Sequence, residues 1–238
     1  MRPRAEVAVI PAAAPATGGG LQAVLFDMDG LLVNTEPLWF EVECDVMARL
    51  GGKWTEQDQQ ALVGGSLQRS VAYLLDRSAG PASHDEVAAS LVGGMTRLLA
   101  QRGVTAMPGA LELYAEVAEA GIAHALVTSS ERVIMDSVLT ALARRDVVFE
   151  VTVCAEDVRS AKPDPEPYLV AAALVGADPR FCVALEDSPN GVAAAEAAGC
   201  VTVAVPGITP IPARPGRLVA RSLTEIDLAT LSAMVTAR

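Results

Sequence analysis

The sequence is poor in aromatic and basic residues. Aromatic residues make up 4% of its 238 residues while 51% are hydrophobic, so we expect Ala, Val and Leu to fill a sizeable core. This composition excludes disorder over most of the chain. The 18 Lys and Arg residues are outnumbered by 29 Asp and Glu residues, giving a net charge of −11 at pH 7. An acidic surface repels phosphate backbones, so we expect no nucleic-acid partner.

Zinc ligands and long hydrophobic runs are also scarce. His84 and His124 are far apart, and the four cysteines include no CxxC pair, so we expect free thiols in a reducing cytoplasm and no zinc site. No run approaches the roughly 18 apolar residues of a membrane span, which argues against a membrane protein. Residues 1–20 contain Glu6 and three prolines, and we interpret them as a disordered tail rather than a signal peptide.

Five short apolar runs predict buried strands. They span residues 23–26, 124–127, 148–153, 182–185 and 201–205. Their continuous apolar character favours parallel strands covered on both faces, and helical patterns lie between most of them. The predicted fold is therefore α/β, a doubly wound parallel five-stranded sheet. The proline-rich stretch 207–216 is expected to be a loop, and residues 227–235 a final helix.

One interval breaks the alternation of strands and helices. Between Asn34 and about Thr105 only helical hydrophobic stripes occur, punctuated by glycine pairs. We therefore expect an inserted all-helical domain over residues 37–104. The sheet domain would comprise residues 21–36 and 105–238.

Carboxylates follow two of the predicted strands. Asp27 and Asp29 come directly after the first strand, where ligands bind in an open α/β sheet. Close carboxylates repel each other and need a cation or a shared proton. Glu186 and Asp187 form a second acidic pair after the fourth apolar run, where an isolated charge would be costly.

Hydroxyl groups and a lysine follow the other two strands. Thr128, Ser129 and Ser130 precede a predicted helix, and hydroxyls with N–H groups at a helix start suit an anion. Lys162 lies in a proline-flanked loop that can place its ammonium beside a phosphate. Each motif alone also has an ordinary interpretation, as an acidic turn, a helix cap or a solvated lysine.

The convergence of these motifs favours a catalytic site over the ordinary interpretation of each motif. Four loops at one edge of one sheet offer carboxylates, hydroxyls and a lysine. Oxygen ligands without His or Cys suit Mg²⁺. A Mg²⁺ ion and a lysine beside a nucleophilic aspartate are typical of a phosphoryl-transfer site.

The same motifs resemble those of the haloacid dehalogenase superfamily. DMDGLLVNTEPLW is similar to its first signature, and LVTSS, SAKPDPEPY and VALEDSPNG are similar to the other three, in order. The resemblance covers residues 21 to about 207. The helical insert resembles the cap domain of β-phosphoglucomutase-like members, and LLVNTEPLWFEVECDVMARLG is similar to phosphatases of 2-deoxyglucose-6-phosphate and hexitol phosphates. Asn34 departs from the Asp that many relatives carry.

The resemblance implies roles for individual residues. Asp27 would be the nucleophile and Asp29 the acid and base. Thr128 and the N–H of Ser129 would hold phosphate oxygens, and Lys162 would offset their charge.

The resemblance also implies the metal ligands. Asp27, the backbone carbonyl of Asp29 and Asp187 would bind Mg²⁺, and Glu186 would bind it directly or through water.

Several residues of the insert are expected to face the substrate. Gly65 and Ser66 lie in a glycine turn that allows close backbone approach. Related mutases carry an arginine where Leu67 stands and a histidine where Trp39 stands, and Trp39 suits the apolar face of a sugar. Arg69 would replace that arginine if the loop register shifted.

The predicted function is therefore a Mg²⁺-dependent phosphatase of a small sugar or polyol phosphate, working through an aspartyl-phosphate. We expect a cytoplasmic monomer. One alternative is a sugar phosphomutase of the β-phosphoglucomutase type. An alternative of another class is a receiver-type phosphoacceptor domain, whose members lack a helical insert.

Overall fold

The structure is a computed structural model and describes residues 19–237. Apart from Gly19 and Gly20, the predicted tail of residues 1–20 therefore lies outside the described residues. Within residues 19–237 every helix is too short or too polar to cross a lipid bilayer.

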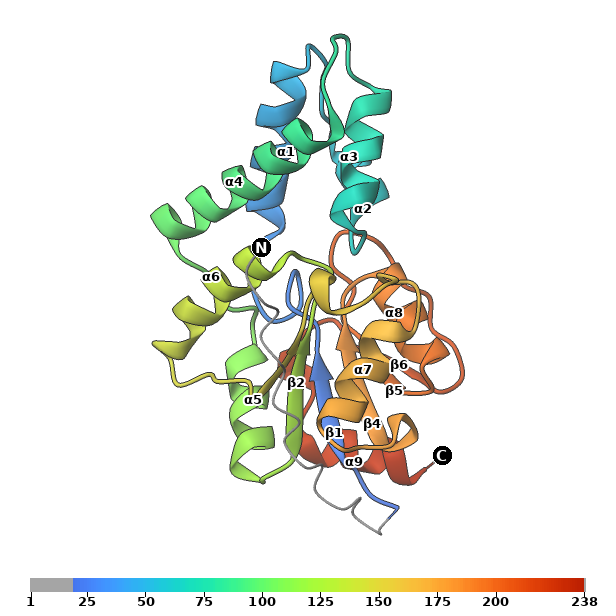
Figure 1. The fold of residues 1–238 in the computed structure, drawn as a ribbon. Coiled ribbons are helices and arrows are strands. Elements are labelled where there is room, and N and C mark those ends of the chain that lie inside the picture. Colours follow the sequence, from blue (N-terminus) through green and yellow to red (C-terminus); the bar gives the residue numbers. More distant parts are fainter. Residues whose placement is uncertain (1–18, 238) are drawn as a thin grey trace.

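A parallel sheet forms the centre of the molecule (Figure 1). Its order is β3-β2-β1-β4-β5-β6, and all neighbours are parallel. The strands are β1 (Ala23–Phe26), β2 (Ala123–Val127), β3 (Val151–Val153), β4 (Cys182–Glu186), β5 (Val201–Ala204) and β6 (Arg217–Val219). The parallel α/β fold is thus confirmed.

The strand count and the start of the third strand differ from the prediction, whereas the other strand ends agree to within one residue. The sheet has six strands rather than five, because β6 adds a short edge strand whose half-buried residues form no continuous apolar run. Strand β3 starts at Val151 rather than at residue 148. The hydroxyl of Tyr114 binds both the N–H and the carbonyl of Val148, at 2.8 and 2.6 Å, and so takes the place of a strand partner.

Helices cover both faces of the sheet. Val24 and Phe26 of β1 pack on one face with α5 (Ala110–Glu119), α6 (Arg132–Ala143) and α9 (Leu228–Thr236). Ala23 and Leu25 face the other side with the alanine-rich α7 (Glu166–Leu174) and α8 (Pro189–Ala197). This alternation along a fully buried strand is what a parallel sheet requires.

Two of these helices begin at prolines. Helix α8 starts with Pro189, and the preceding Ser188 caps it, since its hydroxyl accepts the N–H of Gly191 at 3.0 Å. Pro165 lies at the cap of α7, and the side chain of Asp164 accepts the N–H of Glu166 at 2.9 Å.

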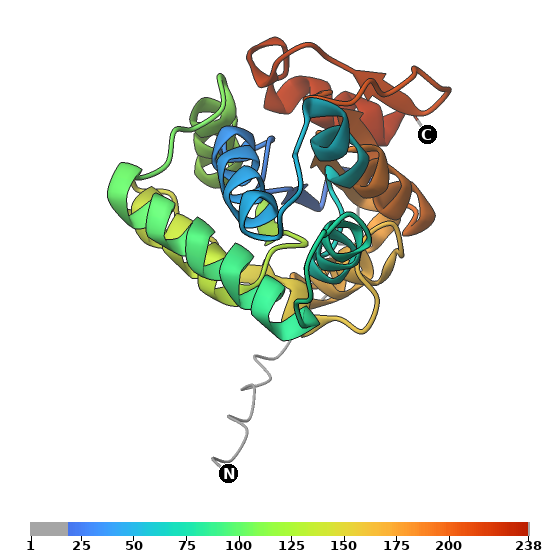
Figure 2. The same cartoon turned by 90° about the horizontal axis from the view of Figure 1, so that it is seen from above.

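Four helices between β1 and β2 form the helical insert. They are α1 (Glu36–Arg49), α2 (Glu56–Leu62), α3 (Leu67–Asp76) and α4 (His84–Arg102). Reciprocal capping bonds of Thr55 with Asp58 and of Ser83 with Glu86 begin α2 and α4. Helices α1, α3 and α4 share a small core of their own, and all four helices lie beyond the carboxyl ends of the strands (Figures 1 and 2).

Two linkers join the insert to the sheet side by side. The N–H of Asn34 donates to the carbonyl of Thr105 at 2.8 Å, and that of Met107 donates to Leu32 at 3.0 Å. Helix α4 also packs against α6. The division of the chain at residues 36–37 and 104–105 remains a prediction.

Candidate active site

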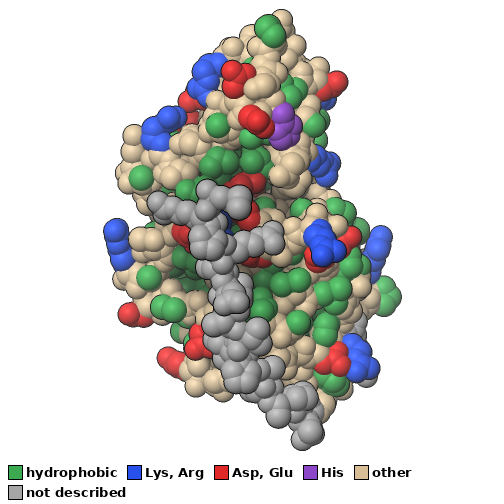
Figure 3. All heavy atoms as spheres, in the orientation of Figure 1, with side chains coloured by type: hydrophobic (Ala, Val, Ile, Leu, Met, Phe, Trp, Pro, Cys, Tyr) green, Lys and Arg blue, Asp and Glu red, His purple; other side chains and the backbone are tan. Residues whose placement is uncertain are grey.

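The motif residues meet in a pocket between the sheet and the helical insert. Figure 3 shows acidic side chains gathered where these two parts of the molecule meet. Asp27, Thr128, Lys162 and Asp187 follow different strands and all line this pocket, because parallel strands end at one edge of the sheet. The predicted convergence of the four loops is therefore present in the structure.

Lys162 lies at the bottom of the site with all three of its N–H bonds in use. Its Nζ donates to Asp27 Oδ1 at 2.6 Å, to Glu186 Oε1 at 2.6 Å and to the carbonyl of Val127 at 2.9 Å. Burial alone would lower the pKa of Lys162, but the charges of Asp27 and Glu186 outweigh it and raise the pKa above its ordinary value. Lys162 is therefore a fixed positive charge beside Asp27.

Three carboxylates lie close together around this lysine. Asp27, Glu186 and Asp187 each offer an oxygen within 4.8 Å of the others. Burial, followed by repulsion within the group, raises the pKa of both Asp27 and Asp187 well above the ordinary value. Asp187 Oδ2 is buried and has no hydrogen-bond partner within residues 19–237. Three buried carboxylates that share one ammonium group and keep one unpartnered oxygen fit a hard divalent cation.

Gly30 is required for the approach of Asp187. The glycine has a φ of +81°, and a Cβ added there would lie 2.1 Å from Asp187 Oδ2. Any larger residue would push away the unpartnered oxygen. The glycine of the first motif therefore keeps the two acidic loops in contact.

Glu186 accepts more hydrogen bonds than the adjacent Asp187. Its Oε1 accepts from Lys162 and from the hydroxyl of Tyr168 at 2.5 Å, and its Oε2 accepts from Ser188 Oγ at 3.2 Å. Tyr168 was not among the predicted site residues, although it ends the SAKPDPEPY motif. Glu186 thus positions Lys162, whereas Asp187 keeps an oxygen free.

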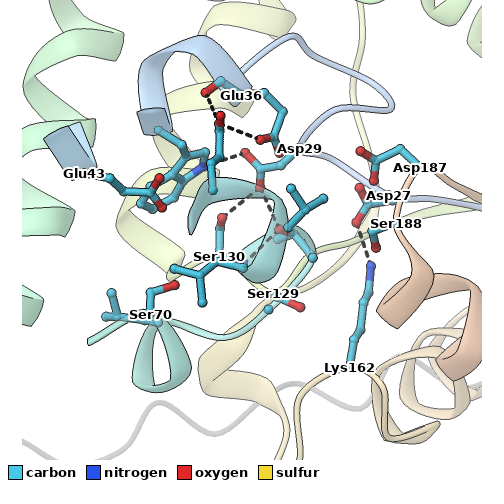
Figure 4. A pocket seen from close by; sticks show the side chains of 18 of the residues that line it. Asp27, Asp29, Glu36, Glu43, Ser70, Ser129, Ser130, Lys162, Asp187 and Ser188 are labelled. Carbon is cyan, nitrogen blue, oxygen red and sulfur yellow. Dashed lines mark hydrogen bonds and ion pairs between the residues drawn. The ribbon is translucent and has the colours of Figure 1, made fainter. Parts of the chain in front are cut away.

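Asp29 is oriented by donors from both parts of the molecule (Figure 4). Its Oδ1 accepts from Thr35 Oγ1 at 2.6 Å and Trp39 Nε1 at 3.4 Å. Its Oδ2 accepts from Ser130 Oγ at 2.8 Å and Thr128 Oγ1 at 3.2 Å. These neutral donors hold the carboxyl in one orientation at the pocket.

The loop after β2 offers a further polar group. Ser129 lines the pocket, and its buried Oγ has no hydrogen-bond partner in the part of the chain that the structure describes. The backbone N–H of Ser130 donates to Thr128 Oγ1 at 3.0 Å, which fixes the loop. A buried hydroxyl that lines the same pocket as Lys162 and Asp27 suits an oxygen of a bound anion.

The turn before α3 only partly matches its prediction. Gly65 and Leu67 line the pocket, but Ser66 does not, because its hydroxyl caps α3 by accepting the N–H of Arg69 at 3.3 Å. The Arg69 guanidinium donates to the carbonyl of Ala61 at 2.8 Å instead of entering the pocket.

The insert supplies pocket residues that the motifs did not reveal. Glu36 and Glu43 line the pocket together with Trp39, and Gln59 and Ser70 join them from α2 and α3. The spacing of Glu36, Trp39 and Glu43 places them on one face of α1. That periodicity was available as a signal once Trp39 was assigned to the pocket.

Known proteins resemble this chain over most of its length. A family model described as haloacid dehalogenase-like hydrolase matches residues 24–205. Hexitol phosphatase B of Escherichia coli (strain K12) is 36% identical over 187 residues, which cover 77% of this chain and 83% of that protein.

Solved structures agree with this match. CbbY from Rhodobacter sphaeroides in complex with phosphate has a TM-score of 0.77 and 28% identity, covering 89% of this chain and 99% of that one. β-Phosphoglucomutase from Clostridium difficile also has a TM-score of 0.77, at 19% identity, with 91% and 98% covered, which speaks for the fold alone.

Proposed function

Since the chain belongs to the haloacid dehalogenase-like hydrolases and is a phosphatase, we propose that it hydrolyses a sugar or polyol phosphate through an aspartyl-phosphate on Asp27, with Mg²⁺ as cofactor. One observation carries this proposal. Asp27, Lys162 and Asp187 form a buried charged group that opens into a pocket beside the well-oriented Asp29.

In the first proposed step, the Asp27 carboxylate attacks the phosphorus of the substrate. The bond from phosphorus to the leaving oxygen breaks, and Asp29 gives its proton to that oxygen, so that the alcohol leaves neutral. Thr35 and Ser130 keep the Asp29 carboxyl directed at the pocket during this transfer.

In the second step, water replaces Asp27 on phosphorus. Asp29 accepts a proton from the water as the water attacks. The bond between phosphorus and Asp27 breaks, releasing inorganic phosphate and the free carboxylate. Lys162 and Ser129 offset and bind the charge on the phosphoryl oxygens throughout.

Magnesium fits this site on the chemistry of its donors. Asp27 and Asp187, with the backbone carbonyl of Asp29, would hold the ion, and the unpartnered Asp187 Oδ2 supports this choice. Bound there, Mg²⁺ would neutralise negative charge on the carboxylates and the phosphoryl group.

The alternatives are less favoured. Lys162 is the only cation among the described residues that line the pocket, and Arg69 is turned to Ala61, so the insert offers no positive group for a second phosphate. The family match gives no support to a receiver-type domain. A monomeric state and a cytoplasmic location remain predictions.

The test is a phosphate-release screen of phosphorylated sugars and polyols with and without EDTA. We expect hydrolysis in Mg²⁺, none in excess EDTA, and none for Asp27→Asn, because an amide is a poor nucleophile. Multiple turnovers by Asp27→Asn would refute the covalent mechanism, and full activity in EDTA would refute the metal requirement.

A further inference from the structure

The wall of the pocket contributed by α1 carries a buried carboxyl that the proposed chemistry does not use. Glu43 is 5% exposed and lines the pocket. Figure 4 shows it on the opposite side of the pocket from Lys162. A substrate whose phosphate reaches Asp27 and Lys162 would therefore direct its leaving group toward this wall.

The Glu43 carboxyl has one hydrogen-bond partner among the described residues. Trp54 Nε1 donates to its Oε2 at 3.1 Å, and Oε1 accepts no hydrogen bond within the described part of the chain. Trp54 is itself held edge-on against the ring of Tyr73. The carboxyl is thus positioned by a rigid partner and has hydrogen-bonding capacity left for a ligand.

The pocket around Glu43 offers no positive charge to an anionic leaving group. No lysine or arginine of the described insert lines the pocket, and Glu36 lies two helical turns away on the same face of α1. Gln59 and Ser70 add neutral polar groups, and Trp39 and Leu67 add apolar surface. A second phosphate or a carboxylate on the leaving group would meet no positive charge here.

Burying a carboxyl without a cationic partner is costly, so its place in a pocket wall points to ligand binding. Burial raises the pKa of Glu43 to about 8, so that the group is mainly protonated near neutral pH. In that form it both donates and accepts hydrogen bonds, as a substrate hydroxyl does.

We propose that Glu43 is a specificity-determining residue that hydrogen-bonds hydroxyls of an uncharged, polyhydroxylated leaving group. Trp54 acts as its positioning residue. The inference rests on the proposed phosphatase function and deepens it. It restricts the substrates to monophosphates whose remainder is neutral.

The test compares kcat/KM for five compounds. Sorbitol 6-phosphate has a neutral polyol as its leaving group, and phosphoglycolate has one with a carboxylate. Glucosamine 6-phosphate differs from glucose 6-phosphate by an ammonium group, so this pair tests for a cation site. p-Nitrophenyl phosphate serves as the reference, because its leaving group has no hydroxyls for Glu43 to bind.

We expect Glu43→Leu to lower kcat/KM for sorbitol 6-phosphate about tenfold or more, mainly through KM, because a bound hydroxyl loses its partner. Hydrolysis of p-nitrophenyl phosphate should stay within about threefold. Glu43→Gln should rescue most of the loss, since an amide also donates and accepts. Asp45→Asn, on the exposed side of the same helix, is the matched control and should leave kcat/KM for both substrates unchanged.

Several outcomes would overturn the assignment. Equal losses for sorbitol 6-phosphate and p-nitrophenyl phosphate in Glu43→Leu would show a structural role only. A wild-type preference for glucosamine 6-phosphate over glucose 6-phosphate that Glu43→Gln removes would show a cation site. If Glu43→Leu fails to fold, Trp54→Phe must lower kcat/KM for sorbitol 6-phosphate more than kcat/KM for p-nitrophenyl phosphate. Wild-type protein inactive on every compound would instead contradict the proposed phosphatase function.

Discussion

Trp39 of the helical insert donates its indole N–H to the Oδ1 of Asp29 in the loop after β1, at 3.4 Å. The contact joins the insert to the proposed acid and base. It is long for a hydrogen bond, so it adds to the stronger bond from Thr35 at 2.6 Å. The position of the insert and the orientation of Asp29 are thereby linked.

We expect Trp39→Phe to lower kcat by about threefold to tenfold with little change in KM, because the ring still covers the pocket while the N–H is lost. Steady-state kinetics on p-nitrophenyl phosphate measure this without the polyol contacts. An unchanged kcat would mean that Thr35, Thr128 and Ser130 orient Asp29 by themselves.

Asp29→Asn should trap the covalent intermediate. The variant lacks the base for water, so phosphorylated Asp27 should accumulate, while Asp27→Asn should carry no phosphate at all. Intact-protein and peptide mass spectrometry detect the added phosphoryl group. Phosphate found on any other residue would contradict the assignment of the nucleophile.

Mg²⁺ should raise the melting temperature of the protein in the absence of substrate. Asp27 and Asp187 are buried with raised pKa values, and a divalent cation would relieve the repulsion between their ionised forms. Thermal unfolding with increasing MgCl₂ and with matched ionic strength in NaCl measures the effect. Asp187→Asn should lose most of this shift, and an equal shift in that variant would place the ion elsewhere.

Glu43 should make the fold less stable as the pH rises. Its ordinary pKa of 4.5 is raised to about 8 in the fold, mainly by burial and then by Glu36, so the folded state binds this proton more tightly than the unfolded state. Its contribution to stability is full below pH 4.5 and is lost as the pH rises to about 8.

Glu43→Gln should therefore lose less stability than the wild type between pH 5 and pH 9. A difference of about 1 kcal/mol corresponds to roughly 2–4 °C in melting temperature for a chain of this size. Melting curves at both pH values, with Asp45→Asn as the control, test this. Parallel pH profiles for Glu43→Gln and the wild type would show that Glu43 is not protonated in the fold.

The enzyme should not act as a phosphomutase. With β-glucose 1-phosphate and glucose 1,6-bisphosphate, inorganic phosphate should form faster than glucose 6-phosphate, because no cation of the described insert reaches the pocket. Glucose 6-phosphate accumulating faster would reverse the assignment, and the loss of this activity in Arg69→Ala would identify that residue as the missing cation.

Sequence patterns predicted the sheet core and the convergence of the four loops on one pocket, because continuous apolar runs and strand-end motifs are local signals. Strand β6 was missed because Arg217–Val219 has no such run and pairs only at the edge. Tyr168 was missed for another reason. Its position depends on which side of α7 faces the site, and that is decided by packing between distant segments. Glu43 lies on the same face of α1 as Trp39, so the assignment of Trp39 to the substrate could have led to it.

The hydrogen bond between Asn34 and Thr105 shows that the helical insert leaves and re-enters the sheet domain at one place. An inserted segment whose two ends are hydrogen-bonded neighbours adds almost no loop-closure entropy to the domain that receives it. Excising residues 35–104 would leave ends that a tight turn of a few residues can join. The substrate-facing residues of these helices could therefore change while the strand-end loops stay as they are, provided that Thr35 and Trp39, which bind Asp29, are kept.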